Sequence, residues 1–177
     1  MILIRTIVLI ASLIASGSIY SQTASTTVSL TLPVVTLMDI EPAGSITLNF
    51  TAPTEAGNAL GTPTPNTSKW VNYTSAITPG GLTRRITASV NKVIAGVNIR
   101  LQAAAASGAG GGTLGTSSGQ VILTTTPVTI ITGIGGAYTG NGINNGHALT
   151  LSLATNTYAN LQAQANTAIV ITYTITE

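Results

Sequence analysis

The feature that most constrains the fold is a two-residue alternation of apolar and hydroxyl side chains, clearest in residues 167–177 (T-A-I-V-I-T-Y-T-I-T-E). One side of an extended chain there carries the larger apolar residues Ile169, Ile171, Tyr173 and Ile175. Successive side chains of a β-strand point to opposite faces. This segment is therefore predicted to be a half-buried strand that closes the fold.

The same alternation recurs upstream, between runs of turn residues. Strands are predicted over residues 26–37, 45–51, 69–74, 82–90, 97–106, 120–124, 128–134, 147–154 and 167–177. Loops rich in Gly, Pro, Thr and Asn are predicted at 52–68 and 135–146, and a short helical turn within 156–165. About nine short, evenly spaced strands predict an all-β fold, a single antiparallel β-sandwich of Ig-like, Greek-key type. A barrel or a β-solenoid is the alternative.

The first 21 residues have the layout of a secretory signal peptide. A positively charged start is followed by an apolar run over residues 7–15 and then by small residues. The run is shorter than the ~18–20 residues that span a bilayer. Cleavage is predicted after Ser18 or Ser21, and residues 22–177 form the β-sandwich domain. We expect a bacterial protein that is secreted, periplasmic or at the cell surface, with no transmembrane segment in the mature chain.

Composition excludes several classes of function. Charged residues make up 6% of the chain, against roughly 25% in a typical soluble domain. Such a chain has no basic stripe to hold nucleic acid. Arg84 and Arg85 are adjacent on a predicted strand and so face opposite sides, with Arg84 on the inner face at the end of the sandwich. The absence of cysteine excludes disulfides and thiolate chemistry.

A glycine-rich run at 110–115 matches the letters G-x-G-x-x-G. The dinucleotide-binding motif needs a helix that begins at this loop, because the helix N-terminus holds the pyrophosphate. The following residues, T-S-S-G, do not begin a stable helix, and no acidic residue lies about twenty positions on. The run is therefore predicted to be a flexible connection between strands, and no cofactor is expected.

Titratable side chains are too few to predict catalysis. His147 is the only histidine and follows an Asn-Gly turn, so it is predicted to lie in a loop. Asp39 and Glu41 can contribute to calcium binding, but without dense acidic spacing they are interpreted as a solvated turn. No catalytic or metal site is predicted, and the protein is expected not to be an enzyme.

Trp70 and Tyr73 are the best candidates for ligand binding, because exposed aromatic rings stack on sugars. Residues three apart on a strand face opposite sides, so the pair forms one platform only if a bulge intervenes. The alternative is that the lone tryptophan anchors the core.

The function predicted from these features is structural or adhesive. Edge strands without charges invite association, and residues 27–34, set apart by Pro33, can add to a neighbour's sheet. The favoured interpretation is a self-contained domain in which residues 168–176 pair with residues 27–34 of the same chain. The alternative is a filament or matrix subunit that associates with itself or with other surface proteins. A carbohydrate- or ligand-binding module that uses Trp70, Tyr73 and the two long loops is the alternative, and an ice- or surface-binding protein with flat threonine arrays is a third.

The alternating segment after the leader and the apolar alternating strand at 167–177 resemble the two ends of chaperone–usher pilus subunits. The resemblance implies an Ig-like subunit whose start completes the groove of the next subunit. Many such subunits carry a cysteine pair that this chain lacks. The leader ending I-Y-S-Q, with Gln22 before a Thr-rich segment, is similar to exported Bacteroidota surface proteins.

Overall fold

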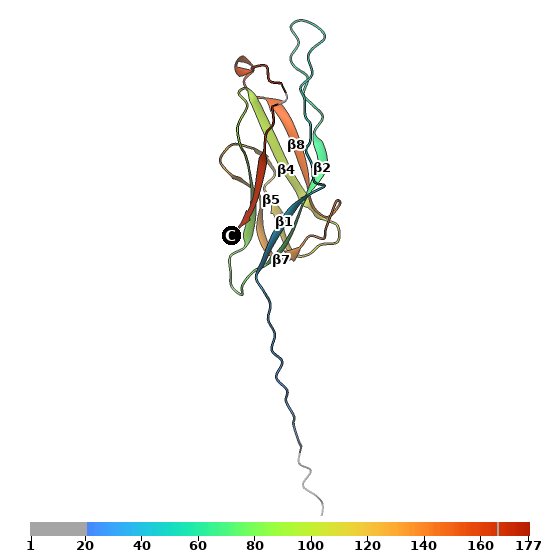
Figure 1. Ribbon diagram of the computed structural model, residues 1–177, viewed down its shortest axis with the longest axis vertical. Helices are drawn as coiled ribbons and strands as arrows, with labels where there is room; N and C mark the ends of the chain where they lie inside the picture. The colour runs from blue at the N-terminus through green and yellow to red at the C-terminus, as the bar shows by residue number, and fades with distance from the viewer. Residues whose placement is uncertain (1–20, 166) are drawn as a thin grey trace, which may run out of the picture. The chain divides into compact units, whose positions relative to one another are not determined.

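The structure is a computed structural model that describes residues 21–165 and 167–177 (Figure 1). The regular structure of the described residues is β-strand apart from one short 3-10 turn, which confirms the all-β prediction. That turn, Tyr158–Asn160, lies within the predicted helical segment. They contain nine strands, close to the predicted number: β1 (Val35–Glu41), β2 (Asn66–Ala76), β3 (Arg84–Val90), β4 (Val97–Ser107), β5 (Gly111–Ser117), β6 (Gln120–Ile122), β7 (Val128–Tyr138), β8 (Gly146–Thr155) and β9 (Ile171–Thr176).

Every strand pairing is antiparallel, and together the pairings make one open sheet that folds into two layers. One layer has the order β1-β2-β8-β4-β6 and the other β5-β7-β3-β9. Strand β2 links them, because it pairs with β8 through Asn66–Val71 and then with β7 at Thr74 and Ser75. The predicted antiparallel β-sandwich is confirmed.

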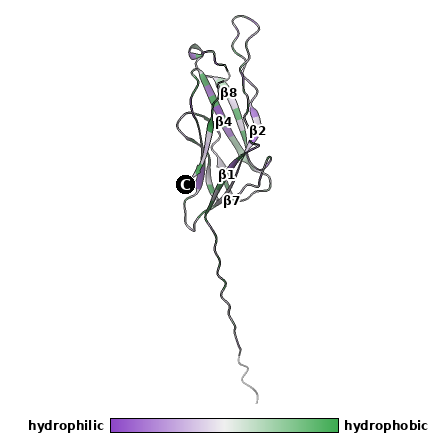
Figure 2. Cartoon of the chain, viewed as in Figure 1, coloured by the Kyte–Doolittle hydropathy of each residue, from purple (hydrophilic) through white to green (hydrophobic). Residues whose placement is uncertain are grey.

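The core lies between the layers and is filled by the inward positions of each strand. In β3, Ile86, Ala88 and Val90 are buried while the residues between them are partly open to solvent. Figure 2 shows the resulting interleaving of hydrophobic and hydrophilic residues along the strands. The most completely buried side chains, including Ile86, Leu101, Ile130, Ile131, Ile134 and Leu149, come from both layers. Aliphatic burial is therefore the main stabilising contribution to this domain.

The prediction was wrong at the first strand. The strand expected at 26–37 lies instead at Val35–Glu41, and the turn expected from Asp39 begins only after Glu41. β1 pairs with β2 over its full length, which places Met38 and Ile40 toward the core. Alternation marks where a strand can form, but an isolated strand is unstable without a partner. Residues 21–34 include the alternating segment but form no strand.

Residues 45–51 are also not a strand, although one was predicted there. Their backbone forms only an isolated bridge between Thr51 and Gly61. The side-chain alternation is nevertheless as predicted, since Ile46, Leu48 and Phe50 are half-buried and the residues between them are exposed. Ile46 and Leu48 pack against the core. This segment is thus extended and apolar on one side, but it lacks ladder hydrogen bonds.

The glycine-rich run predicted to be a flexible connection is strand β5, paired with β7. Its glycines permit close backbone approach. A Cβ at Gly112, where φ is +86°, would lie 2.2 Å from Gly136 O, and one at Gly115, where φ is +75°, would lie 2.7 Å from Thr132 O. Glycine is depleted from strands. The glycine-rich sequence was therefore interpreted as a loop, and this strand was not predicted.

The chain divides into two units, one ending at Leu32 and one running from Pro33 to Glu177. In the first unit, residues 21–32 are described, and Val28, Leu30 and Leu32 there are about four-fifths exposed, at 82%, 79% and 81%. The predicted signal peptide lies outside the described residues apart from Ser21. None of the helical structure in the described residues is long and apolar enough to cross a membrane.

Candidate functional site

Tyr73, one of the two predicted binding residues, is 3% exposed and belongs to the core. Its hydroxyl donates to Leu114 O and lies 3.0 Å from His147 Nε2. Trp70 is half-buried and lies on the other face of β2, opposite Glu41 in the register with β1. The two aromatic residues therefore do not share a platform, as their spacing predicted, and Tyr73 offers no exposed ring.

His147 lies in strand β8 and is fully buried, so the predicted loop position was wrong. The Asn-Gly turn ends at Gly146, whose φ of +77° lets the chain enter β8 directly. His147 Nδ1 lies 2.8 Å from Ala104 O, and its Nε2 lies 3.2 Å from Leu114 O. A proton on Nδ1 satisfies Ala104 O, and the single hydroxyl proton of Tyr73 then has two acceptors within reach, Leu114 O and the unprotonated Nε2.

The Tyr73–His147 pair is a structural connection: both residues belong to the layer that contains β2 and β8, and both contact Leu114 O on β5 of the other layer. The two rings are stacked with centroids 5.8 Å apart. The nearest partners of the imidazole nitrogens are backbone carbonyls and a phenol, not a carboxylate. Among the described residues, no group of three or more His, Asp or Glu side chains is arranged to hold a metal ion.

Arg84 is the buried cation of the domain, at 3% exposure, on the inner face as predicted. Its Nη1 donates to Val35 O at 2.6 Å and to Ser75 Oγ at 2.9 Å. Its Nη2 lies 3.8 Å from an oxygen of the exposed Glu177 carboxylate. The guanidinium thus ties together the start of β1, the end of β2 and the start of β3, which is a stabilising role.

Buried tyrosines predict that stability falls in alkali. Burial raises the pKa of Tyr173 from 10.0 to about 12 and also raises the pKa of Tyr73. From pH 10 upward the unfolded chain loses phenol protons that the folded domain keeps, so each tyrosine costs about 1.4 kcal/mol of stability per pH unit until its folded form titrates. Urea unfolding between pH 8 and 12 should show full stability below pH 10 and a decline above it. Tyr73→Phe and Tyr173→Phe should each make the decline shallower, and an unchanged decline in the double variant would contradict this.

Strand β9, the dark red strand that ends near the marked C-terminus in Figure 1, has a free edge. Its inward residues Ile175, Tyr173 and Ile171 stand opposite Ile86, Ala88 and Val90 of β3. Those β3 residues are buried, whereas the three of β9 are only half-buried. Within residues 21–165 and 167–177, no strand pairs with the other edge of β9. Unpaired backbone groups beside an incompletely covered apolar row make this edge a candidate interaction site.

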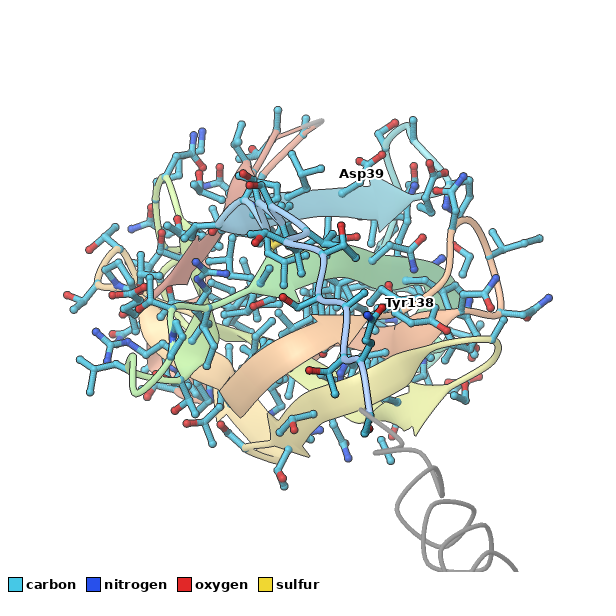
Figure 3. All side chains as sticks on the ribbon, turned by 90° about the horizontal axis from the view of Figure 1, so that it is seen from below. Asp39 and Tyr138 are labelled. Atoms are coloured by element: carbon cyan, nitrogen blue, oxygen red, sulfur yellow. The ribbon has the colours of Figure 1, made fainter. Side chains whose placement is uncertain are left out.

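A second candidate site is a hollow of about 410 Å³ on the outer side of the β1–β2 pair. Its wall comes from β1, β2, the end of β7 and the loop that follows: Leu37, Met38, Asp39, Asn72, Tyr73, Thr74, Tyr138, Gly140 and Asn141. Figure 3 labels its two titratable surface residues, Asp39 on β1 and Tyr138 at the end of β7. Of the residues in this wall, sequence reasoning singled out Tyr73, Asp39 and the Asn-Gly-rich loop, but neither Asn72 nor Tyr138.

The fold and these two sites define an all-β sandwich domain with an open sheet edge and an open surface hollow. No protein-family model, no curated protein and no solved structure matches the chain. Its function is therefore inferred from the geometry of its own residues.

Proposed function

We propose that this is a non-enzymatic, exported structural or adhesive protein whose copies self-associate by strand addition. In this proposal, residues 27–34 of one copy extend the sheet at the free edge of β9 in another. The single observation that carries it is that edge, where Ile171, Tyr173 and Ile175 are half-buried beside unpaired backbone groups. An added strand supplies both the missing hydrogen bonds and the missing apolar cover.

The segment at 27–34 has the chemistry of such a strand. Val28, Leu30 and Leu32 recur at the two-residue spacing of Ile171, Tyr173 and Ile175. Val28, Leu30 and Leu32 are exposed. The segment is longer than the six residues of β9, so it can cover the whole edge. No charged residue lies within it, and burial next to the core therefore has no ionic desolvation cost.

The half-buried row at residues 45–50 supports the same proposal. Ile46, Leu48 and Phe50 alternate as an inward strand does, but their backbone forms no ladder among the described residues. An uncharged, unpaired extended segment invites pairing with another chain, so a protein either covers such a segment or uses it for association. The predicted export signal is consistent with assembly outside the cell.

The oligomeric state of the full secreted chain, beginning at Gln22, tests the proposal. Size-exclusion chromatography with light scattering should show a ladder of oligomers that grows with protein concentration, and negative-stain microscopy should show linear assemblies. A strict monomer at every concentration, together with a synthetic peptide of residues 24–36 that leaves the β9 amide resonances unshifted, would overturn it.

A further inference from the structure

We infer that the hollow between β1, β2 and the loop after β7 binds one neutral sugar residue of a glycan. It shares Tyr73 and the loop at 135–146 with the site predicted from the sequence, but neither Trp70 nor the loop at 52–68, and it does not rest on strand exchange. The volume of the hollow, about 410 Å³, lies within the range of roughly 300–1,000 Å³ that is typical of small-molecule sites.

The floor of the hollow holds an unsatisfied acceptor. Asn72 is 5% exposed, and its Oδ1 accepts no hydrogen bond from the described residues. The amide orientation is set by its other end, because Nδ2 donates to Asn145 O at 2.6 Å and a flipped amide would place two oxygens together. A buried acceptor without a donor costs about 1–3 kcal/mol. Oδ1 itself is fully covered in this structure, so a ligand hydroxyl becomes its donor only after the Asn72 side chain rotates toward the opening, which loosens the hydrogen bond from Nδ2 to Asn145 O.

Asp39 stands directly opposite Asn72 in the register of β1 and β2, so both belong to the outer face of this pair. One carboxylate oxygen of Asp39 already accepts the Ile40 N–H at 2.7 Å, which leaves the other oxygen for a ligand. Asp39 is the only charged residue in the wall. Anionic sugars are therefore disfavoured, and neutral hydroxyl groups are the donors that fit.

Tyr138 supplies an apolar surface for the carbon–hydrogen face of a sugar ring. Its side chain is 55% exposed. The ring lies over Gly111 of β5, where an added Cβ would come within 3.2 Å of it, so the ring is supported from beneath. An organic ammonium ion is the competing ligand, but its recognition uses several aromatic rings around the charge. This hollow offers one aromatic ring together with a carboxylate, an amide and a threonine hydroxyl. That set matches a hydroxylated sugar ring better than an ammonium ion.

The experiment is an amide-resonance titration of the chain from Gln22 in its Leu30→Asp form, which isolates this site from strand addition. The probes are the methyl glycosides of glucose, galactose, mannose and N-acetylglucosamine, each at millimolar concentrations. At least one glycoside should shift the resonances of Asn72, Gly140 and Asn141 in a saturable manner. Tyr138→Leu and Asp39→Asn should each weaken that binding about tenfold.

Two variants of similarly exposed residues outside the hollow serve as matched controls. Tyr158, 53% exposed, is changed to Leu, and Glu55 is changed to Gln; neither change should alter the affinity. The inference is overturned if no glycoside shifts these resonances, or if the site responds to methylammonium or calcium ions and to none of the sugars. Loss of assembly in Leu30→Asp bears only on the strand-addition proposal, so the two proposals fail separately.

Discussion

Leu30→Asp is expected to convert the self-associating chain into a monomer. In the proposed assembly Leu30 is the central residue of the apolar row that covers β9 of another copy. Its loss removes roughly 1.5–3 kcal/mol of apolar burial, and the new carboxylate adds a desolvation cost. We expect each junction to weaken by about 4 kcal/mol or more, roughly a thousandfold in affinity. Light scattering on the chromatographic peak measures the change.

The neighbouring residue provides the matched control. Thr31→Asp introduces the same charge one position further along, on the face of the segment that points away from the core of the other copy. It should keep most of the association. Equal loss in both variants would show that charge, and not the inward row, governs assembly. The urea midpoint of the monomer should be unchanged in both, because residues 21–32 belong to a different unit from the sandwich, which runs from Pro33 to Glu177.

His147→Ala is expected to cost about 3–5 kcal/mol of the free energy of unfolding, a large share of the 5–15 kcal/mol typical of a domain. The change opens a cavity in a fully buried position and leaves Ala104 O without its donor. The lost hydrogen bond adds to the cavity cost. Urea unfolding followed by the fluorescence of Trp70, the single tryptophan, measures the loss.

The control for this variant lies three residues along the same strand. Thr150 is on the opposite face of β8 from His147 and is half-buried, so Thr150→Ala should change stability by about 0.5 kcal/mol or less. A loss below about 1 kcal/mol in His147→Ala would contradict the structural role of the Tyr73–His147 pair.

The local sequence pattern predicted the strands well wherever buried apolar residues alternate with exposed polar ones. β4, β8 and β9 lie within or close to their predicted bounds because their inward residues have a period of two. The first strand was misplaced because the clearest alternation, at residues 27–32, precedes the segment Val35–Glu41 that pairs with β2. β5 was missed because its glycines are required by the close approach of the β7 backbone. That contact is tertiary, so the local sequence gives no sign of it.

The candidate sites depended even more on tertiary contacts. Trp70 and Tyr73 were chosen for their chemistry, but the burial of Tyr73 follows from His147 and Leu114, which are distant in the chain. Asp39 and Asn72 become a pair only through the β1–β2 register, and Tyr138 joins them because β7 meets β2 at Thr74. Nothing in the local pattern of any one strand contains this information.

The sequence by itself determined the all-β class, the inward faces of most strands and the scarcity of titratable groups, because these depend on side-chain period and composition. Tertiary structure alone decided which alternating segments find partners, where the glycine-rich strand lies and which polar residues are buried. The physical reason is that a strand is completed by hydrogen bonds to another segment. The row at 171–175 was predictable as a strand; that its second edge is open was not.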